Sequence, residues 1–234
     1  MMESSTYRSR RDEVRTYFDS TALDAWKRFA GGSPLGRIRD SVREGRSQMR
    51  ETILSRLPSD LQGWRILDAG CGTGAISVAL ARRGACVVGV DLSPETIAYA
   101  QENLPADCRD GAIEFRHGDM LDGELGPFDA VVAMDSLIHY STPDAVEVLA
   151  RLGARTRHTL LFTYVPRTPL LAAMHLTGRL FPKRSRAPSV TPTSPAAIAA
   201  QIAESPALID WQAYDRSRVS HGFYTSELLE LMRR

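Results

Sequence analysis

The sequence predicts one α/β domain with a doubly wound sheet of seven strands, the last one antiparallel. From Gly63 onward, short apolar runs alternate with segments whose apolar residues have helical spacing. Continuous apolar runs, such as residues 130–133, are typical of parallel strands covered on both faces. The first such run, residues 66–69, ends in a turn with glycine at positions 70, 72 and 74. We therefore expect an N-terminal helical arm over residues 1–62 and the sheet domain over residues 63–234, with a helical insertion at about 166–195 after the fifth strand.

The arm is predicted to be helical and basic. Its first 57 residues show helical patterns interrupted at residues 30–34, where Ser33 can cap a second helix that runs to Leu57. Residues 1–65 hold 13 Lys and Arg against 9 Asp and Glu. Two interpretations stay open: amphipathic helices packed on the domain, or a mobile basic lid over an acidic or amphipathic substrate.

Within the domain, each predicted element follows from its own pattern. Ser93 is a second predicted N-cap residue, with Pro94 in the first turn of its helix. The predicted strands are Arg65–Ala69, Cys86–Val90, Ile113–Arg116, Phe128–Met134, Thr159–Tyr164, Trp211–Val219 and Gly222–Thr225, the last two as a hairpin. The predicted helices are Ala75–Arg83, Pro94 to about Leu104, Ala145–Leu152 and Ala196–Glu204.

The segment after the fifth strand has its own composition. Leu170–Phe181 is apolar with helical spacing, and Lys183–Arg186 follows it. Residues 165–190 contain five basic residues and no acidic ones. This segment could cover a large planar ligand or touch a membrane surface, or it could be a helix packed on the sheet edge.

Composition excludes several classes of protein. A formal net charge of +1 argues against nucleic acid as the main partner. Cys71, Cys86 and Cys108 lack metal-ligand spacing, and their odd number argues against a disulfide framework. We therefore expect no protein-bound metal and a reducing, cytoplasmic location. Neither a signal peptide nor a transmembrane run is evident.

The glycine turn allows two cofactors. Gly70, Gly72 and Ala75 satisfy the dinucleotide fingerprint, which is weak on its own. The fuller pattern Asp68-x-Gly70-x-Gly72-x-Gly74 resembles the first motif of class I S-adenosylmethionine-dependent methyltransferases, which have a Rossmann-like sheet. That resemblance implies S-adenosylmethionine as cofactor, with S-adenosylhomocysteine as product. It also implies a cofactor site made of Asp68, Gly70, Cys71, Gly72, Gly74, Asp91, Leu92, Asp119, Met120, Asp135 and Ser136.

Each group in this set has a chemical role under the resemblance. Asp91 can accept both ribose hydroxyls, Asp119-Met120 suits an adenine, and Asp135-Ser136 would lie near the methionine end. All of them follow strands, at the sheet edge where open α/β sheets bind ligands. An Asp that ends a strand is also a common turn residue, and Met120 alone could be a core residue. A nicotinamide enzyme would need a catalytic half for which little chain remains.

The substrate is implied by a second resemblance. Several segments of the sequence together resemble magnesium-protoporphyrin O-methyltransferases of the bacteriochlorophyll branch. They are Tyr17-Phe18-Asp19 with Trp26, the segments 43–46, 134–140 and 180–182, and a final Gly222-Phe223-Tyr224. The resemblance implies methylation of one propionate of Mg-protoporphyrin IX. For this reaction we take His139 and Tyr140 as candidate catalytic residues and Tyr17, Trp26 and Tyr164 as candidate substrate contacts. Ala30 stands where the chlorophyll-branch enzymes have a functionally important tyrosine, so a catalytic tyrosine in the arm does not transfer.

His139 is the main candidate for positioning the propionate, since it follows the fourth strand at the substrate end. A loop-capping histidine is the competing interpretation. Two rival functions stay open: methylation of another small molecule such as a quinone precursor, and a non-catalytic cofactor-binding scaffold. Candidate partners are the porphyrin-binding subunit of magnesium chelatase and, peripherally, the photosynthetic membrane.

Overall fold

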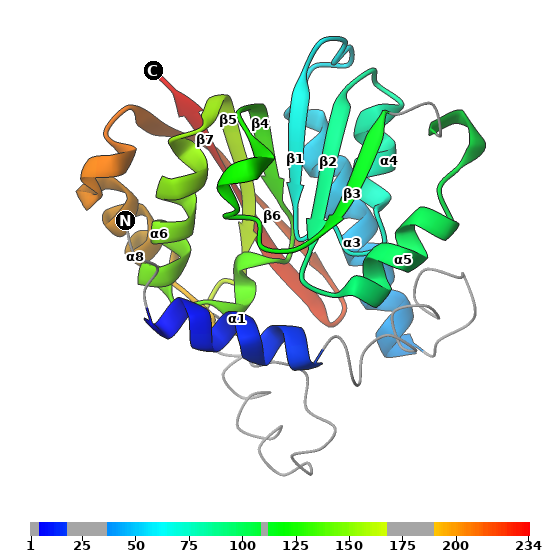
Figure 1. Ribbon diagram of the computed structural model, residues 1–234. Coiled ribbons are helices and arrows are strands. Elements are labelled where there is room, and N and C mark those ends of the chain that lie inside the picture. Colours follow the sequence, from blue (N-terminus) through cyan, green and yellow to red (C-terminus); the bar gives the residue numbers. More distant parts are fainter. Residues whose placement is uncertain (1–4, 18–36, 109–111, 168–189) are drawn as a thin grey trace.

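The computed structural model describes residues 5–17, 37–108, 112–167 and 190–234. Its centre is a seven-stranded sheet with the strand order β3-β2-β1-β4-β5-β7-β6 (Figure 1). The strands are β1 (Arg65–Ala69), β2 (Cys86–Asp91), β3 (Ile113–His117), β4 (Phe128–Ala133), β5 (Thr156–Tyr164), β6 (Trp211–His221) and β7 (Tyr224–Arg233). Strands β1 to β5 pair in parallel, and β7 is antiparallel to both β5 and β6. The predicted doubly wound sheet with an antiparallel last strand is confirmed.

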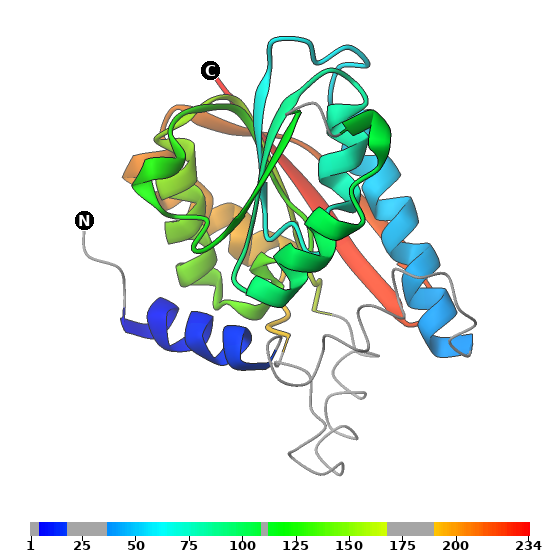
Figure 2. The same cartoon turned by 45° about the vertical axis from the view of Figure 1, so that its right-hand side comes forward.

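Helices cover both faces of this sheet. The α-helices of the described residues are α1 (Ser5–Tyr17), α3 (Arg37–Ser55), α4 (Ala75–Ala81), α5 (Pro94–Glu102), α6 (Thr142–Gly153) and α8 (Pro195–Glu204). Figure 2 shows α3 and α4 on one side of the sheet and α6 and α8 on the other. Short 3₁₀ turns are η2 (Ala106–Cys108), η3 (Gly123–Leu125), η4 (Leu137–His139) and η6 (Pro206–Leu208).

Adjacent residues of β1 show why its apolar run is continuous. Ile66 belongs to the core on the α3 and α4 side, whereas Leu67 belongs to the core on the α6 and α8 side. Both side chains are fully buried. A strand with helices over both faces must be apolar at every position rather than at every second one.

The two described helices of the N-terminal region have different environments. In α3, Met49 and Ile53 are fully buried in the core beside β6 and β7. In contrast, α1 crosses the carboxyl ends of the strands (Figure 1) and buries Tyr7 and Val14. The helix over residues 37–55 therefore contributes to the core, and α1 covers the ligand-binding edge of the sheet.

The helix starts follow their capping residues. Ser93 caps α5 through the amide of Thr96 at 3.3 Å, with Pro94 in the first turn, as predicted. Helix α6 begins at Thr142, three residues before the predicted start, because Ser141 accepts a hydrogen bond from the Asp144 amide. Capping by a serine hydroxyl thus fixes the start of both helices.

The prediction of the last strand was too short. We expected Gly222–Thr225, whereas β7 runs from Tyr224 to Arg233 and is central, between β5 and β6. Its leucines alternate between the two cores: Leu229 and Leu231 face one, and Leu228 faces the other. The hairpin itself is confirmed, with Gly222 at φ 56° in the turn.

The predicted insertion lies largely outside the described residues, as do Leu170–Phe181 and Lys183–Arg186. Its two ends are described: Pro166 bridges to Thr193, and the Thr193 amide donates to the Val165 carbonyl at 3.0 Å. The chain therefore leaves β5 and returns at the same place.

Candidate active site

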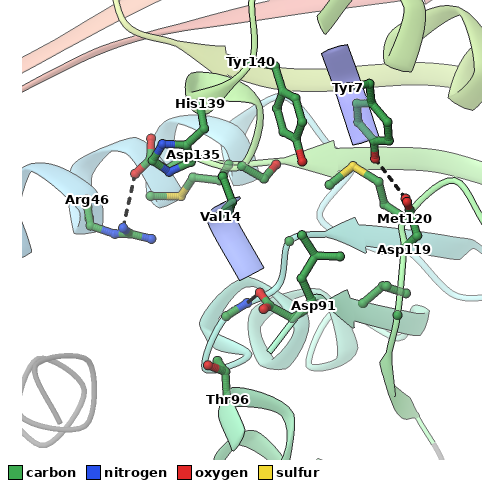
Figure 3. A pocket seen from close by; sticks show the side chains of 17 residues that line it. Tyr7, Val14, Arg46, Asp91, Thr96, Asp119, Met120, Asp135, His139 and Tyr140 are labelled. Carbon is green, nitrogen blue, oxygen red and sulfur yellow. Dashed lines mark hydrogen bonds and ion pairs between the residues drawn. The ribbon is translucent and has the colours of Figure 1, made fainter. Parts of the chain in front are cut away.

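A cavity lies where β1, β2 and β4 end, beneath α1 (Figure 3). Most of the predicted site residues line it: Gly70, Gly72, Asp91, Leu92, Asp119, Met120, Asp135, Ser136, His139 and Tyr140. The structure also contributes Tyr7 and Val14 from α1, Arg46 from α3, and Val90, Thr96, Gly118 and Met134. Segments far apart in the chain thus form one cavity at the edge where open α/β sheets bind ligands.

The glycine turn joins β1 to this cavity. Gly70 and Cys71 both donate their amides to the Val90 carbonyl, at 2.8 and 3.0 Å. Gly70 has φ 82°, and a Cβ added there would lie 2.4 Å from Cβ of Ser136. Only glycine combines this backbone conformation with so close an approach. The turn after β1 therefore contacts the turn after β4.

Asp91 is held in place by backbone amides. Its Oδ2 accepts from the Gly72 amide at 2.9 Å, and its Oδ1 accepts from the Ser93 amide at 3.0 Å. A carboxylate has about four acceptor positions, so both oxygens can accept further hydrogen bonds. The carboxylate is therefore fixed in orientation while it faces the cavity.

Three predicted cofactor residues of the turn do not line the cavity. Asp68 is buried and accepts from the Ser77 hydroxyl at 2.6 Å; burial raises the pKa of this carboxyl to about 6. Burial also raises the pKa of the Cys71 thiol. Gly74 precedes α4 at φ 80°, and a Cβ there would lie 2.6 Å from the ring of Phe115. These residues support the conformation of the turn without contacting the cavity.

At one side of the cavity, α1 contacts the residues after β3. Tyr7 donates its hydroxyl to Oδ1 of Asp119 at 3.0 Å, and Arg11 pairs with Oδ2 at 3.0 Å. The Tyr7 ring stacks on Tyr140, with centroids 5.0 Å apart and planes 21° apart. Burial raises the pKa of both tyrosines, so their hydroxyls stay protonated at neutral pH. Met120 is buried beside them.

At the other side, Asp135 follows β4 in a strained conformation. Its φ of 54° is positive, alone among the described non-glycine residues. Its carboxylate accepts from the hydroxyls of Thr163 at 3.1 Å and Tyr224 at 3.1 Å, and it pairs with Arg46 at 3.5 Å. Burial, followed by the charge of Asp135, raises the pKa of Tyr224. Residues of α3, β5 and β7 therefore hold this acid.

His139 ends η4 and has a buried side chain. Its backbone carbonyl accepts from Arg10 Nε at 2.7 Å, which ties η4 to α1. His139 lines the main cavity and also an open groove between α1 and the start of α6, with Ser9, Ser141 and Thr191. The histidine therefore lines both the main cavity and a more open groove.

The predicted substrate contacts are not gathered at the main cavity. Tyr17 is half-buried at the end of α1 and does not line it. Tyr164 lines a smaller neighbouring cavity, and its hydroxyl donates to the buried carboxylate of Glu227. Trp26 lies outside the described residues.

Sequence reasoning missed Tyr7, Arg11, Arg46 and Tyr224 as cavity or carboxylate contacts. Arg46 and Tyr224 stood within segments 43–46 and 222–224 that carried the family resemblance, which was the available signal. Tyr7 and Arg11 lie on α1, spaced as neighbours on one helix face, but nothing in the sequence indicates that this face meets Asp119.

The donor set fits an S-adenosyl group. Figure 3 shows Asp119 and Met120 at one side, Arg46 and Asp135 at the other, and Asp91 between them. This order matches a molecule with a base, a sugar diol and an amino acid in sequence. Within the part of the chain that the structure describes, no three His, Cys, Asp or Glu residues are grouped so that they could hold a metal ion.

Comparison with known proteins identifies the family. A family model described as magnesium-protoporphyrin IX methyltransferase C-terminus matches residues 133–233, and a general methyltransferase domain model matches residues 66–158. The magnesium-protoporphyrin O-methyltransferase of Rhodobacter capsulatus is 47% identical over 97% of this chain and 98% of that protein. The chain belongs to the magnesium-protoporphyrin O-methyltransferase family.

Other members of the family agree in sequence and in structure. The magnesium-protoporphyrin O-methyltransferase of Synechocystis is 32% identical over 74% of this chain and 76% of that protein. A crystal structure of magnesium protoporphyrin IX methyltransferase from Synechocystis with bound S-adenosylhomocysteine superposes with a TM-score of 0.83 at 28% identity, covering 96% of this chain and 100% of that one. The fold predicted from sequence, a class I methyltransferase sheet, is that of the family.

The quinone-related alternative matches a smaller part of the chain. A ubiquinone biosynthesis O-methyltransferase of Xylella fastidiosa is 42% identical, but over 40% of this chain and 38% of that protein. The family's C-terminal model covers 133–233, a range that begins just before Asp135 and includes His139 and Tyr224.

Proposed function

We propose that the protein transfers a methyl group from S-adenosylmethionine to one propionate carboxylate of Mg-protoporphyrin IX, giving the monomethyl ester and S-adenosylhomocysteine. The observation that carries this proposal is the 47% identity to the Rhodobacter capsulatus enzyme along essentially the full length of both chains. The order of carboxylates along the cavity supports the cofactor.

Different residues of the cavity bind different parts of the cofactor. Asp119 and Met120 receive the adenine, with an acceptor for its amine and an apolar wall. Asp91, fixed by two backbone amides, accepts the two ribose hydroxyls. The turns that carry Gly70 and Ser136 receive the methionine part. When bound, the cofactor supplies an electrophilic methyl group on a sulfonium.

The methyl transfer requires little acid–base catalysis from the protein. Carboxyl groups titrate at about 4 to 5, so a propionate is already ionised at neutral pH and no general base is needed. The protein must remove water and align one oxygen behind the methyl carbon. Both reacting charges are neutralised in the transfer, so a strong fixed charge on the propionate would stabilise the reactants more than the transition state.

His139 suits this requirement. His139 lines both the cofactor cavity and the open groove, so we propose that a substrate in the groove meets the cofactor beside this residue. An imidazole donor can orient one propionate oxygen without the full charge of an arginine. Tyr140, the next residue, lines the cavity and stacks on Tyr7, so we assign it to closing the site against water.

The remaining substrate contacts and partners are part of the same proposal. We propose that three residues contact the macrocycle: Tyr17 and Trp26 of the N-terminal region, and Tyr164. The porphyrin-binding subunit of magnesium chelatase would deliver the substrate, and the protein would contact the photosynthetic membrane peripherally. None of the helices in the described ranges is long and apolar enough to span a membrane.

One assay separates the candidate functions. The purified protein is incubated with Mg-protoporphyrin IX and S-adenosylmethionine, and the monomethyl ester is measured by chromatography. A parallel reaction contains a hydroxylated quinone precursor instead. We expect a methylated product in the reaction with Mg-protoporphyrin IX and none in the reaction with the quinone precursor. Methylation of the quinone precursor only would replace the proposed substrate, and binding of S-adenosylhomocysteine without turnover on either would favour the scaffold.

A further inference from the structure

The loop between β3 and β4 carries Asp119 and Met120, the two residues to which the proposed function assigns the adenine. Both line the cavity (Figure 3). Oδ1 of Asp119 accepts from the Tyr7 hydroxyl at 3.0 Å and from the Leu121 amide at 2.8 Å. Its Oδ2 pairs with Arg11 at 3.0 Å. Counted over the described residues, these contacts occupy three of the roughly four acceptor positions of a carboxylate, and the fourth, on Oδ2, suits an amine.

A residue outside the cavity, Arg155, fixes the backbone of this loop. It lies in the turn between α6 and β5 and does not line the cavity. Its Nη2 donates to the Met120 carbonyl, and its Nη1 donates to the Asp122 carbonyl. The planar fork of a guanidinium can span two carbonyls at once, in a fixed geometry that an ammonium group lacks. The backbone carbonyl of an adenine-binding residue is therefore held by Arg155.

The peptide between Met120 and Leu121 connects Arg155 to the carboxylate of Asp119. Its carbonyl accepts from Arg155, and its N–H, on the Leu121 nitrogen, donates to Oδ1 of Asp119 at 2.8 Å. Because a peptide group is planar, fixing the direction of the carbonyl also fixes the direction of the N–H. Hydrogen bonds in series polarise one another, so a cation on the carbonyl also strengthens the N–H as a donor. Arg155 thus acts on the orientation of Asp119 through one peptide group.

We propose that Arg155 is a positioning residue for the adenine of the cofactor: through the peptide that follows Met120, it directs Oδ2 of Asp119 toward the 6-amino group of the base. The inference rests on the adenine assignment in the proposed function and adds a residue outside the cavity that sets the geometry of this contact. Without Arg155 the peptide is no longer held at its carbonyl. The Asp119 carboxylate then turns, and its hydrogen bond to the amine weakens.

A second arginine on the same loop provides a matched control. Arg65 donates through Nη1 to the carbonyls of Leu125 and Pro127, both at 2.8 Å, at the other end of the loop. The guanidinium groups of Arg65 and Arg155 also lie over one ring, that of Phe128, at 4.6 and 5.8 Å from its centroid. Support of the loop is therefore common to both arginines, and an effect on the adenine contact is expected for Arg155 alone.

The test compares two ligands that differ only at position 6 of the purine. S-adenosylhomocysteine has an amino group there, and its 6-deamino analogue has hydrogen. Calorimetry measures both ligands on the wild-type protein, on Arg155→Gln and on Arg65→Gln. The wild type should bind S-adenosylhomocysteine about 10- to 100-fold more tightly than the analogue, because the analogue lacks a hydrogen bond to a charged acceptor. In Arg155→Gln this ratio should fall to about 1- to 3-fold through weaker binding of S-adenosylhomocysteine, whereas Arg65→Gln should keep the wild-type ratio.

A wild-type ratio in Arg155→Gln would overturn the proposal, because Arg155 would then only stabilise the loop, and so would an equal fall in both arginine variants. If Arg155→Gln does not fold, Arg155→Lys replaces it. Its ammonium group lacks the fork, so the ratio should still fall by about 3-fold or more, and an unchanged ratio would overturn the proposal. Wild-type protein that binds both ligands equally would contradict the adenine assignment and this inference with it. Failure to methylate Mg-protoporphyrin IX would contradict the proposed substrate alone, since the calorimetric ratio requires no porphyrin.

Discussion

The contact between Gly70 and Ser136 joins the two turns that receive the methionine part, and it gives a sharp test of the glycine turn. Gly70 has φ 82°, and a Cβ there would lie 2.4 Å from the Cβ of Ser136. Gly63 has nearly the same backbone conformation, φ 81°, with nothing within 4 Å of an added Cβ. Gly63→Ala is therefore a matched control that isolates backbone strain from the close approach.

The magnitudes follow from these two geometries. Alanine in the left-handed region costs about 1–2 kcal/mol, which both substitutions share. Overpacking adds about 1–3 kcal/mol at position 70 alone. In a chain of this size, each 1 kcal/mol lowers Tm by about 2–4 °C. We expect Gly70→Ala to lose about 2–5 kcal/mol of unfolding free energy and Gly63→Ala about 1–2 kcal/mol.

Denaturant unfolding, followed by tryptophan fluorescence, measures both losses, and calorimetry with S-adenosylhomocysteine measures binding. Gly70→Ala should weaken binding because it pushes the Ser136 turn away, whereas Gly63→Ala should not. Adding Ser136→Gly to Gly70→Ala removes the clashing Cβ and should recover part of the loss. Equal destabilisation by the two alanine variants, or no recovery in the double variant, would refute the reasoning.

Three further predictions concern single side chains. His139→Ala should lower turnover about 100-fold and leave S-adenosylhomocysteine affinity unchanged; unchanged turnover would remove His139 from the mechanism. Asp91→Asn should weaken S-adenosylhomocysteine about 10- to 100-fold in calorimetry, because an amide offers the ribose one acceptor oxygen instead of two; retained affinity would contradict the ribose assignment. Burial raises the pKa of Asp68 from 3.8 to about 6, so the native state binds this proton more tightly than the unfolded state. As pH rises from about 3 to 7, the wild type should therefore lose about 3 kcal/mol of stability relative to Asp68→Asn, and parallel pH profiles would contradict this.

Local patterns were sufficient for most of the fold. The strand–turn–helix at residues 65–83 was predicted because its apolar period changes across a glycine turn, and the structure has β1 and α4 there, with α4 ending at Ala81. The predicted last strand ended too early because apolar and polar residues do not follow one another in strict alternation over Glu227–Leu231. A strand buried on both faces loses the period of two, and only its neighbours β5 and β6 identify it.

The site likewise has residues that the sequence predicted and residues that it did not. Asp91, Asp119 and Asp135 were found because each follows a strand, and parallel strands bring their ends together. Their partners could not be found by spacing. Tyr7 meets Asp119 across 112 positions of the chain, and Tyr224 meets Asp135 across 89. Such contacts depend on how α1 and the last hairpin pack, which periodicity does not encode.

The origin of the charges in the cavity suggests which part of the protein sets its specificity. The sheet supplies the three acids, at or just after the carboxyl ends of its strands, where open α/β sheets bind ligands. The described basic residues that pair with two of them come from the N-terminal region: Arg11 of α1 with Asp119, and Arg46 of α3 with Asp135. The same region supplies Tyr7, which covers Tyr140, and Arg10, which holds the backbone of His139. Changes in α1 and α3 should therefore alter ligand recognition while the sheet stays the same, so exchange of residues 5–17 between family members would test whether α1 carries part of the substrate preference.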